Sequence, residues 1–250
     1  MTLEQFFLEN PRVALAFSGG VDSAYLLYAA QKAGAKVRAY YVKTEFQPEF
    51  EYQDAMKLAK LLEAPVTVLR QSALEDAQVA ANPGNRCYYC KRRIFEAIWQ
   101  AARDDGFSVL LDGTNASDQV ADRPGIRALR ELEVRSPLRE AGLTKAMIRE
   151  ASRQAGLFTW DKPAYACLAT RIPTGKTITP EDLERTQWAE DYLRGLGFRD
   201  LRVRLFEGCA RVQLPQGQMQ AFLERKEEIT QKLKTRYAGV LLDMEARNGQ

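Results

Sequence analysis

The residues best suited to chemistry lie near the N-terminus, in the segment Ser18-Gly19-Gly20-Val21-Asp22-Ser23. Glycines let a backbone approach a phosphate closely, and the two serine hydroxyls add hydrogen-bond donors. Asp22 is placed to cap a helix or to orient a phosphate that carries Mg²⁺. The segment therefore predicts a binding site for phosphate groups.

Two elements must position this segment. Residues 13–17 have the length and composition of a buried strand, and the apolar residues after Gly20 are spaced to line one face of a helix. A strand, a glycine turn and a helix start direct backbone amides and the positive end of the helix dipole at an anion. The segment is not the P-loop G-x-x-x-x-G-K-[ST], because the lysine is missing.

The six residues together resemble the pyrophosphate loop (PP-loop) of the N-type ATP pyrophosphatases, which include GMP synthetase, NAD synthetase, asparagine synthetase and the tRNA thiolases. The resemblance implies that ATP is split between its α and β phosphates and leaves an adenylylated substrate. A plain glycine turn with a helix cap is the alternative, but it accounts poorly for six matching residues between a strand and a helix. The residues expected to bind the nucleotide are Ser18, Gly19, Gly20, Asp22 and Ser23.

The rest of the chain predicts an α/β fold with a parallel-sheet PP-loop domain at residues 1–168 and a small α+β domain at residues 169–250. Strands and helices alternate in the first part, as in βαβ units. A helix, a hairpin, a helix and a strand follow, which suggests an antiparallel sheet. The predicted strands are 13–17, 36–42, 66–69, 107–111, 201–206, 210–214 and 239–243, and the predicted helices are 20–33, 50–62, 88–103, 143–155, 180–196 and 218–234.

A second glycine turn, at residues 111–118, follows one of these strands. Gly113, Asn115 and Asp118 are candidates for binding adenosine or Mg²⁺ at the carboxyl end of the sheet. Asp-Gly-Thr-Asn is also a common turn, so a purely structural role stays open.

The composition is that of an ordinary globular protein with anionic substrates. The 250 residues carry a net charge of +3, with 28% charged and 46% hydrophobic residues. There is no apolar run of membrane-spanning length and no secretory signal pattern, which predicts a cytoplasmic protein. Histidine is absent, so a metal must be bound by thiolates, carboxylates or substrate oxygens.

Four cysteines leave several interpretations open. Cys87 and Cys90 form a Cys-x-x-Cys pair at a loop-to-helix junction, where both sulfurs can face one metal. The four thiols could be structural, could form a Cys₄ zinc site, or could include a redox dithiol. Alternatively, three of them hold a [4Fe–4S] cluster in which one iron lacks a protein ligand. Cys209 has no Cys-x-x-Cys partner, which disfavours zinc. Cluster ligands would be Cys87, Cys90 and Cys167.

Motifs along residues 10–215 resemble the LarE family, the ATP-dependent sulfur transferases of nickel-pincer nucleotide synthesis. The resemblance implies adenylylation of a carboxylate of pyridinium-3,5-biscarboxylic acid mononucleotide and replacement of the adenylate by sulfur. One branch sacrifices a cysteine sulfur, and another holds a [4Fe–4S] cluster on three cysteines, which the cysteines of this chain match. The motifs are Asn82-Pro83, residues 86–91, Gly113-Thr114-Asn115, Asp122-Arg123-Pro124-Gly125, Ser136-Pro137-Leu138, Gly142-Leu143-Thr144-Lys145 and residues 167–173.

The resemblance also assigns roles to single residues. Cys167 and Arg171 would act at the sulfur site, Arg202 and Arg204 would bind the substrate phosphate, and Glu190 would be a metal ligand. The arginine pair alternates onto one face of a predicted strand, so both can grip one phosphate. Taken alone, these residues also fit an exposed polar strand face and a solvated helix position.

The expected partners are a small-molecule mononucleotide and a sulfide source, with ATP and Mg²⁺ as cofactors. No membrane is expected, nucleic acid is disfavoured, and a homo-oligomer is compatible with the sequence. A tRNA thiolase that uses a [4Fe–4S] cluster is the main alternative, although a charge of +3 is small for an RNA-binding surface. An amide-forming ligase would leave the Cys-x-x-Cys pair without a role, and a nucleotide sensor would release no pyrophosphate.

Overall fold

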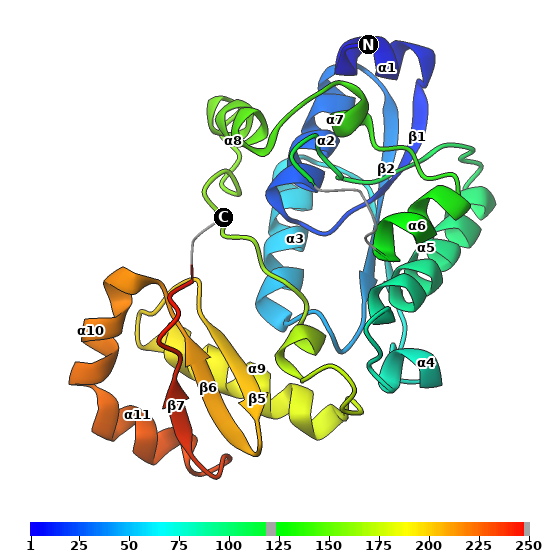
Figure 1. Cartoon of the computed structure of the whole chain (residues 1–250). Helices are drawn as coiled ribbons and strands as arrows, with labels where there is room; N and C mark the ends of the chain where they lie inside the picture. Colours follow the sequence, from blue (N-terminus) through cyan, green and yellow to red (C-terminus); the bar gives the residue numbers. More distant parts are fainter. Residues whose placement is uncertain (119–123, 248–250) are drawn as a thin grey trace. The chain divides into compact units, whose positions relative to one another are not determined.

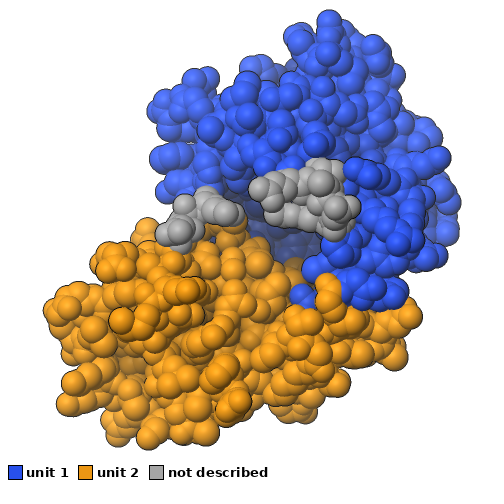
Figure 2. Space-filling view, in the orientation of Figure 1, with its two compact units in different colours: residues 1–44, 49–72, 85–162 blue, residues 45–48, 73–84, 163–250 orange. Residues whose placement is uncertain are grey.

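The computed structural model describes residues 1–118 and 124–247, which form two compact units (Figures 1 and 2). Asp122 and Arg123, part of one motif, lie outside the described residues. No described helix is long and apolar enough to cross a membrane. The first unit comprises Met1–Thr44, Glu49–Ser72 and Asn85–Lys162, and the second comprises Glu45–Pro48, Ala73–Gly84 and Pro163–Gln250.

The first unit is built on a parallel sheet of four strands in the order β3-β2-β1-β4. All three strand pairs are parallel, which confirms the predicted α/β class. The fourth strand is shorter than the predicted residues 107–111, because only two residues pair with β1. The strands are β1 (Arg12–Ala16), β2 (Lys36–Lys43), β3 (Val66–Arg70) and β4 (Leu110–Leu111).

Helices cover both faces of this sheet (Figure 1). Successive residues of a strand point to opposite faces, so Val13 and Leu15 join one core and Ala14 joins the other. The first core contains residues of α1 (Leu3–Glu9), α2 (Val21–Lys32), α3 (Glu49–Leu61), α7 (Pro137–Glu140) and α8 (Lys145–Gln154). The second contains residues of α5 (Arg86–Asp104) and α6 (Pro124–Glu131).

The strand order places the two glycine turns side by side. The chain leaves β1 for β2 on one side and pairs β1 with β4 on the other, so the order reverses between β1 and β4. Ligands of open parallel sheets bind at such a point, outside the carboxyl ends of the strands. Residues 17–20 follow β1 and residues 112–118 follow β4, so this end of the sheet positions both.

The second unit contains a three-stranded sheet in the order β5-β6-β7. The hairpin of β5 and β6 is antiparallel as predicted, but β7 is parallel to β6. The expectation of a wholly antiparallel sheet was wrong, because the helices between β6 and β7 act as a crossover connection. Its elements are α4 (Ala77–Ala80), η1 (Leu168–Arg171), α9 (Pro180–Gly195), β5 (Arg202–Phe206), β6 (Cys209–Gln213), α10 (Gln216–Glu224), α11 (Lys226–Leu233) and β7 (Val240–Leu242).

Helix ends in this unit follow local sequence signals in one place and not in another. Thr179 caps α9, and its hydroxyl accepts from the amide of Asp182 at 3.1 Å, with Pro180 in the first turn as predicted. The single helix predicted over residues 218–234 is instead two helices, because Arg225 leaves the helical conformation at φ −105°.

Candidate active site

The pyrophosphate loop closes through the hydroxyl groups of its two serines. The Ser23 Oγ donates to the Gly20 carbonyl at 3.2 Å and lies 3.1 Å from the Ser18 Oγ. The backbone N–H of Ser18 donates to the Ser23 Oγ at 3.3 Å. Gly20 begins α2 in an extended conformation, and no described side chain caps the helix there. The first amides of α2 are therefore left for an anion.

Two glycines let the loops at this end of the sheet come close. Gly19 has φ +73°, and a Cβ at this position would lie 2.6 Å from the Ala55 Cβ and 2.8 Å from its Cα. The loop thus packs directly on α3. Gly113 has the same function on the other side, because a Cβ there would lie 3.1 Å from the backbone nitrogen of Ser23.

The turn after β4 is tied to the pyrophosphate loop through Asn115, which is only 2% exposed. Its side-chain amide donates to the Asp22 Oδ1 at 3.3 Å, and its backbone N–H donates to the Asp118 Oδ2 at 2.9 Å. Asp112 accepts from the hydroxyls of Thr114 and, at 2.6 Å, of Ser136. Gly113, Asn115 and Asp118 thus lie in the same unit as the loop, with Asn115 in contact with it.

Lys145 is a residue at this site to which the sequence reasoning assigned no role. Its Nζ lies 2.5 Å from the Asp22 Oδ2, and its backbone N–H donates to the Ser117 Oγ at 2.9 Å. Lys145 is the first residue of α8, after the N-cap Thr144. A cation in the first turn of a helix is opposed by the helix dipole. This unfavourable position is the sequence feature that could have identified Lys145 as a functional residue. The lysine brings a positive charge to the pyrophosphate loop.

The Cys-x-x-Cys pair lies in the first turn of α5. Cys87 is exposed and Cys90 is half-buried. Residues three apart share one helix face, so the two side chains leave the helix on the same side. Gly125 of α6 packs on this turn, since a Cβ there would lie 2.9 Å from the Lys91 Cδ. Nothing bulkier than glycine fits without displacing the lysine stem.

The Cys167 loop of the second unit is held by its neighbours along the chain and by Phe46, whose carbonyl accepts from the Leu168 amide at 2.9 Å. The Thr170 Oγ1 donates to the Cys167 carbonyl at 2.9 Å. One guanidinium nitrogen of Arg171 donates both to the Ala166 carbonyl at 2.9 Å and to the Thr170 Oγ1 at 2.8 Å. Arg171 therefore contacts the chain on both sides of Cys167.

Glu190 of α9 is fully buried and accepts hydrogen bonds from four groups. They are the Arg171 Nε at 2.7 Å, the Val203 amide at 3.0 Å, the Tyr165 hydroxyl at 2.6 Å and the Arg194 guanidinium at 3.0 Å. Burial alone would lower the pKa of Arg171, but the attraction of Glu190 outweighs it and the pKa is raised. Burial also raises the pKa of Tyr165. The hydroxyl therefore keeps its proton and donates it to the carboxylate.

Arg202 and Arg204 lie on one face of β5, as their alternation predicted. Arg204 donates to the Thr170 carbonyl at 2.8 Å, which connects this face to the Cys167 loop. The Arg202 side chain has no hydrogen-bond or ion-pair partner in residues 1–118 and 124–247. Burial, and then the charges of Arg247, Arg171 and Arg204, lower the pKa of Arg202 to about 10. A half-buried cation surrounded by cations favours the binding of an anion.

The predicted site residues therefore fall into two sets. One set, in the first unit, is Ser18, Gly19, Gly20, Asp22, Ser23, Gly113, Asn115 and Asp118, together with Cys87 and Cys90. The other set, in the second unit, is Cys167, Arg171, Glu190, Arg202 and Arg204. In the described part of the chain, no three His, Cys, Asp or Glu side chains are grouped so as to hold a metal ion. The three-cysteine cluster and the metal role of Glu190 stay predictions.

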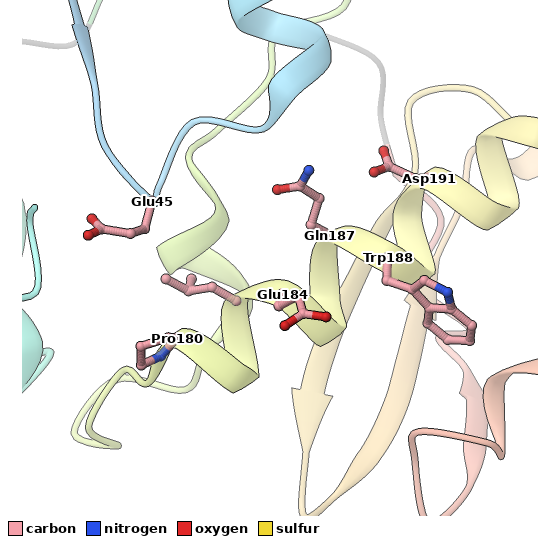
Figure 3. Close-up of a pocket in the computed structure, with 7 residues that line it drawn as sticks. Glu45, Pro180, Glu184, Gln187, Trp188 and Asp191 are labelled. Atoms are coloured by element: carbon pink, nitrogen blue, oxygen red, sulfur yellow. The ribbon is translucent and has the colours of Figure 1, made fainter. Parts of the chain in front are cut away.

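A cavity of about 370 Å³ in the second unit has a different character. Figure 3 shows most of its side chains projecting from α9, with Glu45 contributed by the segment that follows β2. Three carboxylates face it, so it disfavours an anionic nucleotide. It is lined by Glu45, Pro180, Leu183, Glu184, Gln187, Trp188 and Asp191.

Comparison with known proteins identifies the family. No family model matches the chain. An uncharacterised protein of Synechocystis is 38% identical over 224 residues, which cover 89% of this chain and 83% of that protein. The pyridinium-3,5-bisthiocarboxylic acid mononucleotide synthase of Lactiplantibacillus plantarum is 33% identical over 236 residues, which cover 94% of this chain and 86% of the synthase. The chain belongs to the LarE family.

A more distant relative places the LarE family among the PP-loop enzymes. The tRNA-specific 2-thiouridylase MnmA of Thermotoga maritima is 26% identical over 145 residues, which cover 48% of this chain and 40% of that protein. The match and the loop geometry agree with the superfamily predicted from Ser18–Ser23. The LarE-family chain is thus a sulfur-transferring enzyme with a PP-loop domain.

Proposed function

We propose that this chain inserts sulfur into the carboxylates of pyridinium-3,5-biscarboxylic acid mononucleotide through an acyl adenylate, as a step of nickel-pincer nucleotide synthesis. The observation that carries the proposal is the 33% identity, over 94% of the chain, to a synthase named for the bisthiocarboxylic acid product. The geometry of the two residue sets supports it, since one suits ATP and the other suits an anionic substrate.

The first half-reaction uses the pyrophosphate loop. A carboxylate is a poor electrophile, so one of its oxygens attacks the α-phosphorus of ATP and pyrophosphate leaves with the electron pair. The open amides at the start of α2 and the ammonium of Lys145 balance the charge of the leaving group. Asp22 would orient ATP-bound Mg²⁺ once Lys145 turned from the carboxylate to the phosphates.

The second half-reaction uses the residues of the second unit. Arg202 and Arg204 hold the phosphate of the mononucleotide, and the contact of Arg204 with Thr170 keeps that phosphate next to the Cys167 loop. A sulfide sulfur then attacks the acyl carbon, and AMP leaves with the electron pair. The product is a thiocarboxylate, and the proton of the hydrosulfide goes to solvent.

The thiols of this chain fit the donor set of a [4Fe–4S] cluster. Cys87 is exposed, Cys90 and Cys167 are half-buried, and Cys87 and Cys90 share one face of a helix start. Thiolates are the usual ligands of such clusters. Held by three cysteines, a cluster would supply an iron able to carry the sulfide. Cys209, on β6, is the thiol left without a role in this proposal.

The test is product analysis with anaerobically purified protein, ATP, Mg²⁺, sulfide and the mononucleotide. We expect pyrophosphate release and, by mass spectrometry, exchange of a carboxylate oxygen for sulfur. Sulfur found in tRNA, or nitrogen found in the product when ammonia is supplied, would overturn the proposal in favour of a tRNA thiolase or an amide-forming ligase.

The cluster has its own test. The anaerobic protein should contain iron and sulfide and absorb in the visible range, and Cys87→Ala, Cys90→Ala and Cys167→Ala should each remove that absorption. Cys209→Ala is the matched control and should keep it. Equal loss in all four variants would indicate a four-cysteine site instead.

A further inference from the structure

The buried ion pair of Arg171 and Glu190 connects α9 to the Cys167 loop. Both side chains are fully buried, with the Arg171 Nε 2.7 Å from the Glu190 Oε1. The guanidinium also lies 4.7 Å from the ring centre of Tyr165, which donates to the same carboxylate. These contacts hold the Arg171 side chain in one orientation. Its other N–H groups can therefore fix the position of the backbone that they bind.

The remaining donors of Arg171 bind the Cys167 loop. One nitrogen donates to the carbonyl of Ala166, directly before Cys167, and to the hydroxyl of Thr170, three residues after it. That hydroxyl donates in turn to the Cys167 carbonyl. Ala166 and Thr170, on either side of the cysteine, are thus bound by one guanidinium, whose orientation depends on Glu190.

We propose that Glu190 and Arg171 are positioning residues that fix the Cys167 loop for the sulfur-transfer half of the reaction. The inference rests on the proposed function for the role of Cys167. It gives Glu190 a role as a buried counter-ion, which differs from the metal ligand suggested by the family resemblance. Five N–H or O–H donors from four residues already occupy its two oxygens, so a metal would have to displace the clamp.

The first experiment separates the two half-reactions in Glu190→Gln. At saturating mononucleotide, pyrophosphate release should depend on the pyrophosphate loop of the first unit and stay within about twofold of the wild type. Sulfur incorporated per pyrophosphate should fall about tenfold or more. Asp182→Asn is the matched control, because Asp182 is also a buried carboxylate of α9 with cationic partners, Lys176 and Arg185, that do not bind the loop. Equal loss of both half-reactions in Glu190→Gln would overturn the proposal.

A second measurement does not depend on the reaction. Amide hydrogen exchange in peptides covering residues 164–172 should become about tenfold faster in Glu190→Gln and stay unchanged in Asp182→Asn. Unchanged exchange in Glu190→Gln would refute the clamp. If wild-type protein incorporates no sulfur, the proposed function fails, yet the exchange result still decides whether Glu190 holds the loop.

A double variant separates positioning from stability. Replacing a buried ion pair by apolar residues restores stability lost in the single variants. Arg171→Met combined with Glu190→Leu should therefore unfold at a higher temperature than Glu190→Leu alone, and its sulfur transfer should remain low because Ala166 and Thr170 still lack their donor. Recovery of sulfur transfer together with stability would show that the pair only supports the fold.

Discussion

The pyrophosphate loop of the first unit and the Cys167 loop of the second are held by different kinds of contact. The pyrophosphate loop depends on glycine, which lets Gly19 pack directly on Ala55, and on a hydrogen bond between two serine hydroxyls. The Cys167 loop depends on a carboxylate and a guanidinium that are both fully buried. The pyrophosphate loop leaves backbone amides open to a ligand, whereas the buried polar groups at the Cys167 loop form hydrogen bonds within the protein.

This difference determines whether a substitution in each loop lowers activity, stability or both. A glycine loop on a stable sheet can be displaced with little effect on folding, because few buried groups depend on it. A buried ion pair cannot lose one partner without leaving the other charged and unpaired. Substitutions should therefore affect activity at the pyrophosphate loop, and both stability and loop geometry at Glu190.

The largest effect is expected from Glu190→Ala. The variant should lower the free energy of unfolding by about 3–5 kcal/mol, because Arg171 remains buried without its counter-ion. Urea denaturation of the whole chain measures this. Asp182→Ala, whose partners Lys176 and Arg185 both reach solvent, should lose only about 1 kcal/mol. Equal losses in the two variants would show that the fully buried pair stabilises the second unit no more than a partly exposed one.

Gly19→Ala should have the next largest effect, this time on activity. The added Cβ would lie 2.6 Å from the Ala55 Cβ at φ +73°, so the loop must move away from α3. A displacement of this size should slow pyrophosphate release about 100-fold. Gly34→Ala is the control, since Gly34 has φ +76° but nothing within 4 Å of the new Cβ. It should cost about 1 kcal/mol of stability and leave activity unchanged.

Arg202→Gln should produce a smaller change, in substrate affinity. Losing one charged hydrogen-bond donor to the phosphate should raise KM for the mononucleotide about tenfold, with kcat nearly unchanged. The pyrophosphate loop belongs to the other unit and is unchanged in this variant. Arg199→Gln removes the same charge from an exposed residue just before β5 and should leave KM unchanged. A fall in kcat alone would place Arg202 in the chemistry instead of in binding.

The sequence predicts the two loops unequally well, and the reason is the distance between contacting residues. The pyrophosphate loop was predictable because its glycines and serines are consecutive and sit between a strand and a helix. Lys145 meets Asp22 from 123 positions away, so only the parallel sheet brings them together. The ion pair of Arg171 and Glu190 likewise needs the packing of η1 on α9. Local sequence patterns predict contacts between neighbouring residues of the chain, and they do not predict contacts between residues far apart in it.

The same limit applies to the small sheet. The alternation of β5 and β6 and the turn between them predict a hairpin, and the structure confirms it. The direction of β7 depends on how α10 and α11 lead the chain back to the edge of β6, and no local sequence pattern predicts this. The shared face of Arg202 and Arg204 on β5 was therefore easier to predict than contacts between segments far apart in the chain.

The smallest effect expected is a gain in stability from Arg202→Gln in the absence of ligand. Arg202 has a lower pKa in the folded chain than its ordinary value, because of burial and then of neighbouring arginines. A base that holds its proton less tightly when folded destabilises the fold at neutral pH, where it is charged. Solvent screening reduces this for a half-buried group, so the variant should gain only about 0.5 kcal/mol.

Inorganic phosphate distinguishes this gain from a simple surface effect. Phosphate should raise the unfolding temperature of the wild type, because an anion relieves the repulsion among the arginines, and it should do so much less for Arg202→Gln. Glu190→Ala and Arg202→Gln would then change stability in opposite directions within one unit. If Arg202→Gln instead destabilises the free protein, the guanidinium has a structural partner, and the anion site must be sought elsewhere on β5.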